Sequence, residues 1–154
     1  MMLLSSIWLR ERVCAVVIGS QSTATKVTTT TTTSGKRSQQ TLAYSEISID
    51  PNDKREEKET VVILHGLLGQ SRNFRSWAMA LAPKLESKRR IVCLDLRNHG
   101  ASFHNDLMSF TNMADDVFTT LDDLDIERCV LLGHSLGAKV AMTSAFQSPD
   151  RIER

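Results

Sequence analysis

The chain has 154 residues, of which 41% are hydrophobic and 24% are charged, so its length and composition fit one ordinary globular domain. The formal net charge of +1 excludes broad electrostatic steering toward nucleic acid or an anionic membrane. We therefore expect no nucleic-acid partner. No apolar run approaches the ~18 residues that a membrane span needs, so we also expect no membrane span.

The first forty residues differ in composition from the rest of the chain. They contain one acid, Glu11, against five basic residues, and they include an unbroken threonine run at 28–33. Such a segment buries too little apolar surface to offset the entropy lost on ordering, so we predict that residues 1–40 are disordered. A basic, Ser-rich and acid-poor composition is typical of an organelle transit peptide but does not separate the mitochondrion from the plastid. We expect the mitochondrion. The alternatives are a plastid address, or a tail without an address on a cytoplasmic protein.

Ordered structure is expected over residues 41–154. Residues 41–49 predict a first strand, residues 50–53 a turn, and the mixed charges of 54–59 a solvated loop. The apolar run 61–64 is typical of a strand buried on both faces of a parallel sheet. A helix should follow, since Trp77, Leu81 and Leu85 recur at four-residue spacing, and Pro83 should kink that helix or end it early.

The remaining elements continue this alternation. Residues 91–94 and 129–132 predict two further buried strands, separated by a polar loop at 98–108 and a helix. One face of that helix carries Met113, Val117, Leu121 and Leu124, and a last helix carries the small or apolar residues Val140, Ala141, Ser144 and Ala145. Alternating strands and helices predict an α/β fold with right-handed crossovers and a parallel sheet.

The three cysteines are Cys14, Cys93 and Cys129, an odd number without metal-ligand spacing. We expect reduced thiols, two of them on buried strands. No motif in the sequence calls for a metal ion or an organic cofactor, and we expect none.

The strongest functional signal is Gly133-His134-Ser135-Leu136-Gly137, which matches G-x-S-x-G between a predicted strand and a predicted helix. The serine of this motif lies on a sharp, strained turn, where side chains at 133 and 137 would crowd the neighbouring backbone. The turn exposes the Ser135 hydroxyl to a base and directs the Leu136 N–H at a developing oxyanion. An ordinary helix N-cap would require neither glycine, so we predict that Ser135 is a nucleophile.

A second signal, His65-Gly66-Leu67-Leu68-Gly69, closes the first buried strand at the carboxyl edge of the sheet. Gly66 would let the backbone turn so that the Leu67 N–H points at the same oxyanion, which gives two backbone donors. The alternative is a turn that merely ends the strand. The presence of the serine motif favours the oxyanion role.

A third signal, at residues 95–102, follows the second buried strand. Gly100 and Ser102 indicate a shaped loop, and we expect Asp95 and Arg97 to fix it by hydrogen bonds and charge pairing rather than to act as acid or base. None of the four histidines is suited to be the catalytic base; they are His65, His99, His104 and His134.

Together these motifs resemble the α/β-hydrolase superfamily. The strings HGLLGQSRNF, DLRNHGAS and GHSLGAKVAM are most similar to the branch that contains mitochondrial abhydrolase-domain proteins and short bacterial esterases. The resemblance covers residues 41–154 and implies a mostly parallel sheet with flanking helices. It also implies Ser135 as nucleophile and the Leu67 and Leu136 N–H groups as oxyanion donors. The residues that support these motifs are His65, Gly66, Gly133, His134 and Gly137.

In this fold the acid and the histidine of the triad follow the serine, and the chain reaches Arg154 without them. We therefore expect the N-terminal part of a hydrolase domain, truncated after the nucleophile helix and inactive by itself. The expected reaction is hydrolysis of a small-molecule carboxylic ester or thioester through an acyl-enzyme on Ser135. The alternatives are a non-catalytic hydrolase-fold binding protein for a small molecule and an inactive truncated product.

Overall fold

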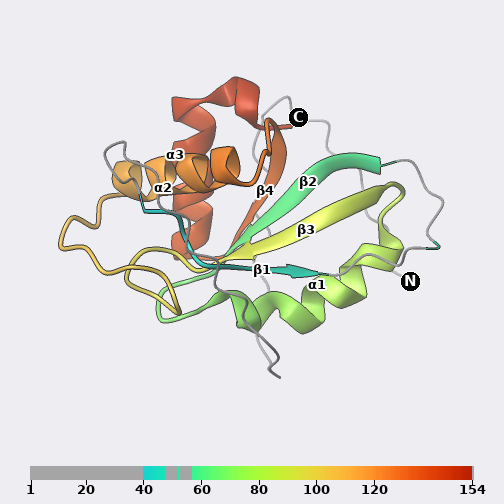
Figure 1. Cartoon of the computed structure of the whole chain (residues 1–154), viewed down its shortest axis with the longest axis horizontal. Helices are drawn as coiled ribbons and strands as arrows, with labels where there is room; N and C mark the ends of the chain where they lie inside the picture. Colours follow the sequence, from blue (N-terminus) through green and yellow to red (C-terminus); the bar gives the residue numbers. More distant parts are fainter. Residues whose placement is uncertain (1–39, 48–51, 53–56, 154) are drawn as a thin grey trace, which may run out of the picture.

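The computed structural model describes residues 40–47, 52 and 57–153, which form a sheet with helices on both faces (Figure 1). The strands are β1 (Tyr44–Ile47), β2 (Glu57–Leu64), β3 (Lys88–Leu94) and β4 (Cys129–Gly133). The helices are α1 (Arg75–Leu81), α2 (Phe110–Asp123) and α3 (Leu136–Gln147), with short 3-10 turns η1 (Ser71–Phe74), η2 (Ala82–Lys84) and η3 (Pro149–Arg151). The predicted transit segment, apart from Gln40, lies outside the described residues, as does Cys14.

The sheet is mostly parallel, as the sequence predicts. Its strand order is β1-β3-β2-β4, with β2, β3 and β4 parallel and β1 antiparallel to β3. Beyond β4, Ile152 forms an isolated parallel bridge with Cys129.

Two apolar cores lie on opposite faces of the sheet. On one face, buried residues of the strands pack with Met113, Val117 and Leu121 of α2 and with Val140 of α3. On the other face, residues such as Ile63 and Cys93 pack with Ala78 and Trp77 of α1. The apolar helix faces predicted from the sequence are therefore the faces that pack against the sheet.

Cys93 and Cys129 are free and buried, in agreement with the prediction of reduced thiols. Burial raises the pKa of each thiol to about 12. Both thiols therefore stay protonated at neutral pH and serve as small apolar groups in the core.

Pro83 ends α1 as predicted, because the chain tightens into η2 at Ala82 and becomes extended at Leu85. The prediction of a solvated loop at 54–59 is wrong in its last part. Residues 57–59 already belong to β2, which pairs with β3 from Glu57↔Lys88 onward and contains an irregularity between Lys58 and Val61. Glu59 faces Arg89 and Arg128 across the strands, so a charged sequence continues the strand beyond the apolar core.

The order of the strands creates a switch point between β2 and β4. The chain leaves β2 toward α1 on one face, whereas it leaves β4 toward α3 on the opposite face (Figure 1). Crevices outside the carboxyl ends of such neighbouring strands are where α/β sheets bind ligands.

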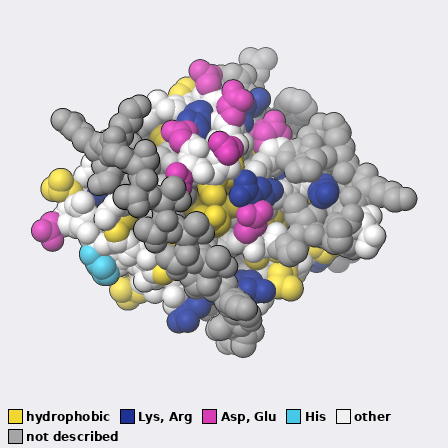
Figure 2. All heavy atoms as spheres, viewed as in Figure 1, with side chains coloured by type: hydrophobic (Ala, Val, Ile, Leu, Met, Phe, Trp, Pro, Cys, Tyr) yellow, Lys and Arg dark blue, Asp and Glu magenta, His cyan; other side chains and the backbone are white. Residues whose placement is uncertain are grey.

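The described part of the chain contains no helix long and apolar enough to cross a membrane. Acidic and basic side chains are interspersed on the face seen in Figure 2.

Candidate active site

Ser135 lies on the sharp turn between β4 and α3. Its backbone has φ 51° and ψ −108°, outside the conformations that L-residues ordinarily adopt, and its side chain is exposed. Such a conformation costs on the order of 1–3 kcal/mol and persists only where the surrounding structure enforces it. Ser135 precedes the first residue of α3, and its side chain makes no capping hydrogen bond.

The flanking glycines explain how the turn is enforced. A Cβ atom at Gly133 would lie 2.4 Å from the Cα and N atoms of Ala138, and one at Gly137 would lie 2.3 Å from the Leu64 carbonyl oxygen. Both distances are far shorter than a real carbon contact, so the start of α3 packs directly on backbone. The predicted crowding at 133 and 137 is confirmed.

The second motif forms a reverse turn after β2. The Gly69 N–H donates to the Gly66 carbonyl oxygen at 2.9 Å, and Leu68 at the third position has φ 60°. Leu67 and Leu68 form the tip of the turn and are 64% and 90% exposed. A Cβ at Gly66 would lie 2.6 Å from Nδ1 of His134, so this turn and the serine turn pack against each other.

The two turns are in register because β2 and β4 are paired neighbours. Leu64 pairs with Gly133, and the His134 N–H donates to the Leu64 carbonyl oxygen at 2.9 Å. Leu67 and Leu136 each lie three residues beyond this pair. Neither of their N–H groups has a hydrogen-bond partner among the described residues. Each of the two neighbouring turns, at the carboxyl ends of β2 and β4, thus carries one backbone N–H without a partner among the described residues.

His65 is buried and both of its ring nitrogens are engaged. Nδ1 lies 2.7 Å from the Gly66 carbonyl oxygen, and Nε2 accepts the Leu96 N–H at 3.0 Å, so the proton resides on Nδ1. Burial lowers the pKa of His65, and this outweighs the hydrogen bond to the Gly66 carbonyl, which raises it; His99 lowers the pKa a little further and Asp95 raises it. His65 is therefore a neutral structural residue that joins the ends of β2 and β3.

The other histidines do not reach Ser135 either. His134 packs its ring against Phe74, with ring centroids 6.1 Å apart. His99 bonds through Nδ1 to the Arg97 carbonyl oxygen, and His104 is exposed on the loop before α2. Within the described ranges no histidine is hydrogen-bonded to the Ser135 hydroxyl.

The loop after β3 is built around the buried carboxylate of Asp95. Oδ1 accepts the Ser71 N–H at 2.5 Å and Oδ2 accepts the Ala101 N–H at 2.9 Å. The Ser102 hydroxyl donates to the Asp95 carbonyl oxygen and accepts the Ala43 N–H. Gly100, with φ 54°, lies over the carboxylate, where a Cβ would come within 2.1 Å of Oδ2. These contacts agree with the predicted shaping role of the loop.

Arg97 is buried and forms a bidentate pair with Asp116 of α2. It also donates to the carbonyl oxygens of Leu107 and Asn112, and its guanidinium lies 5.6 Å from the centre of the Phe103 ring. Burial raises the pKa of Asp116, and the hydrogen bond from Arg97 opposes that rise. The sequence predicted charge pairing for Arg97 but not its partner, nineteen residues away.

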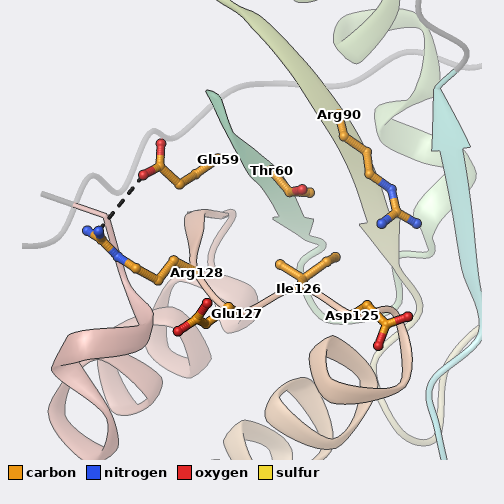
Figure 3. A pocket seen from close by; sticks show the side chains of 7 residues that line it. All are labelled: Glu59, Thr60, Arg90, Asp125, Ile126, Glu127 and Arg128. Atoms are coloured by element: carbon orange, nitrogen blue, oxygen red, sulfur yellow. Dashed lines mark ion pairs between the residues drawn. The ribbon is translucent and has the colours of Figure 1, made fainter. Parts of the chain in front are cut away.

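A separate open hollow of about 510 Å³ lies at the other end of the sheet. Its lining includes Thr60, which pairs with Cys129 at the start of β4, whereas Ser135 follows the end of β4 (Figure 3). Arg128 faces Glu59 there, and Arg90 is held by two bonds to Glu46. The residues that line this hollow include no serine and no glycine, so it lacks the two glycine turns and the hydroxyl found at the carboxyl ends of β2 and β4. In the part of the chain that the structure describes, no cluster of His, Cys, Asp or Glu could hold a metal ion.

Residues 59–154 match the family model described as the alpha/beta hydrolase fold. The sn-1-specific diacylglycerol lipase ABHD11 of Xenopus tropicalis is 45% identical over 109 residues, which are 71% of this chain and 34% of that protein. A putative esterase/lipase of Haemophilus influenzae is 35% identical over 94 residues, 61% of this chain and 31% of that protein.

Among solved structures, a marine microorganism esterase superposes with a TM-score of 0.63 at 32% identity. The superposition covers 74% of this chain and 40% of that chain. The chain therefore spans between about a third and two fifths of the length of these relatives.

Proposed function

The chain belongs to the α/β-hydrolase fold family, in the branch of the abhydrolase-domain proteins, and we propose that it supplies the nucleophile and the oxyanion hole of a serine hydrolase. The observation that carries this proposal is the exposed, strained Ser135 at the switch point of the sheet, in a turn packed against a second turn, each turn with an unpartnered backbone N–H. The proposed substrates are small-molecule carboxylic esters or thioesters. Relatives named as a lipase and as an esterase support this class.

The reaction begins when the Ser135 hydroxyl oxygen attacks the acyl carbonyl carbon while a base takes the hydroxyl proton. The tetrahedral intermediate collapses, the alcohol or thiol leaves with a proton, and the acyl group remains on Ser135. Water then hydrolyses this acyl-enzyme and restores the serine. No metal or organic cofactor takes part.

The Leu67 and Leu136 N–H groups would bind the oxyanion of each tetrahedral intermediate. Their direction is fixed before substrate arrives, because Gly137 seats α3 on β2 and the Gly66–Gly69 hydrogen bond closes the second turn. Loss of one such donor typically lowers kcat by ~10²–10³. The N-terminus of α3 adds a partial positive charge beside the same oxygen.

We propose that the base and its orienting acid are residues other than the described histidines, because His65, His99 and His134 are engaged or turned elsewhere and His104 is exposed on the loop before α2. The proposal therefore concerns a polypeptide in which this chain is joined by an acid and a histidine. We expect residues 1–154 alone to be inactive, since Ser135 then has no activating partner.

Ester turnover by the native protein tests the proposal. The wild type should hydrolyse a p-nitrophenyl ester, and Ser135→Ala should lower kcat by roughly 10⁶-fold, the loss typical of removing a triad serine. Thr143→Ala, an exposed hydroxyl on the same helix, is the matched control and should keep wild-type turnover. Tight ligand binding without turnover by the wild type would instead support a non-catalytic binding protein.

A further inference from the structure

We propose that Asp95 is a positioning residue for the oxyanion hole, because its buried carboxylate anchors the end of the turn that carries the Leu67 N–H. This inference rests on the proposed function. Asp95 itself lies too deep to touch substrate, since it is 5% exposed. It acts through the backbone of residues 66–71.

The segment 66–71, which contains this turn, is held at both ends, and Leu67 and Leu68 between them are exposed. At its start, Gly66 accepts hydrogen bonds from His65 Nδ1 and from the Gly69 N–H. At its end, the Ser71 N–H donates to Asp95 Oδ1 at 2.5 Å. The tip residues Leu67 and Leu68 have no such restraint of their own, so the two anchors set where the Leu67 N–H points.

The carboxylate is itself rigidly placed. Its second oxygen accepts the Ala101 N–H, its own backbone bonds to Ala43 and Ser102, and Gly100 covers it so closely that no side chain fits there. A buried carboxylate that accepts from two backbone N–H groups makes strong, charge-assisted hydrogen bonds. Asp95 thus links the end of β3 to the segment that follows β2 and holds that segment in place.

An asparagine at 95 has nearly the same shape but cannot accept both hydrogen bonds, because its amide nitrogen is a donor. One end of the segment 66–71 would then be released while the serine turn, which Asp95 does not contact, stays in place. The Leu67 N–H binds charge that develops only in the transition state, so the loss should fall on kcat and leave KM unchanged.

The test compares Asp95→Asn with the wild type in the full-length active protein. The variant should lose about 10–100-fold in kcat, less than the ~10²–10³ that complete loss of a donor costs, with KM within about twofold. The dissociation constant of an arylboronic acid, which forms a tetrahedral adduct on Ser135, should rise by a similar factor. Should Asp95→Asn fail to fold, Asp95→Ser removes the charge with less crowding under Gly100 and carries the same prediction.

Asp116→Asn is the matched control. It makes the same chemical change at a buried aspartate bound to the same loop, but it leaves the Ser71–Asp95 hydrogen bond intact. It should lower thermal stability and keep kcat and boronate affinity.

Equal kinetic losses in Asp95→Asn and Asp116→Asn, or unchanged kcat in a folded Asp95→Asn, would overturn the positioning role. If the wild type neither binds the boronate nor depends on Ser135 for turnover, the proposed function itself fails.

Discussion

At the scale of single residues, the site depends on glycines at positions where any side chain would clash with neighbouring backbone. Gly137 lies so close to β2 that a Cβ would approach the carbonyl oxygens of Leu64 and His65 to 2.3 and 2.6 Å. This contact holds the first turn of α3 in place and so fixes both the Ser135 hydroxyl and the Leu136 N–H.

Gly137→Ala should therefore destabilise the protein although it places a better helix former in a helix. Helix propensity alone would add about 1 kcal/mol to the free energy of unfolding. We expect instead a loss of about 1–3 kcal/mol, the typical cost of overpacking, together with reduced ester turnover. Urea unfolding measures the sign directly, and an increase in stability would show that α3 is not seated on β2 backbone.

The buried His65 should make stability depend on pH. Its pKa in the folded state lies below 6.5, chiefly because burial disfavours the charged ring, whereas in the unfolded chain it titrates near 6.5. Below pH 6.5 the unfolded chain thus binds more protons than the folded one. Stability from this group is complete above pH 6.5 and is lost as the pH falls.

Comparison of wild type and His65→Gln at pH 7.5 and 5.5 by urea unfolding checks this sign. The free energy of unfolding should fall more steeply toward acid pH in the wild type, because glutamine does not titrate. His104→Gln, which changes an exposed loop residue, should retain the wild-type pH dependence. An equal slope in wild type and His65→Gln would show that His65 is not held neutral.

At the scale of elements, α2 illustrates how a local signal fixes the start of a helix. Ser109 has extended backbone, and its hydroxyl accepts the Asn112 N–H at 3.1 Å, which satisfies one of the donors left free at a helix start. The preceding loop is bound to the same helix by Arg97 and Asp116. The cap therefore contributes to holding the loop at the carboxyl edge of the sheet.

Ser109→Ala should lower the free energy of unfolding by about 0.5–2 kcal/mol, the usual cost of losing an N-cap. Thr119→Ala removes a hydroxyl that only bonds to the Asp115 carbonyl within the same helix, and it should change stability by less than about 0.5 kcal/mol. Chemical unfolding of both variants separates them. Similar values for the two would show that the Ser109 cap contributes little.

The parallel strands could be predicted from sequence because continuous apolar runs report burial on both faces. The same signal placed the start of β2 too late, since residues 57–59 pair with β3 outside the apolar core and are polar. Hydrophobic pattern reports burial, and backbone pairing can extend beyond it. Pro83, in contrast, acts locally through its missing N–H, so its effect on α1 was predictable.

The site was predictable where a motif joins residues close in sequence, as in the serine turn. Asp95 reaches Ala101 within its own loop, but its contact with Ser71 spans 24 residues, and only the packed sheet brings Ser71 to β3. The spacing of Asp95 and Gly100 in the sequence indicates a shaped loop, but it does not identify Ser71 as the distant partner of Asp95.

At the scale of the whole molecule, we propose that residues 1–40 are a transit peptide that determines where the protein is located. A fusion of these residues to a fluorescent protein should localise to an organelle, because the segment is basic and nearly free of acids, and we expect that organelle to be the mitochondrion. Replacing Arg10 and Arg12 by glutamine should weaken that localisation. Plastid fluorescence would favour the alternative address, and diffuse fluorescence of the unmodified fusion would contradict a transit role.

The central claim is that Ser135 is a nucleophile, and labelling of the native protein with a fluorophosphonate probe tests it most directly. Trypsin cleaves after Arg128 and Lys139, and the resulting peptide 129–139 contains Ser135 as its single serine. We predict that this peptide carries the mass of the probe, and that heat denaturation before labelling abolishes the adduct. An unmodified 129–139 peptide from folded, probe-treated protein would contradict the account.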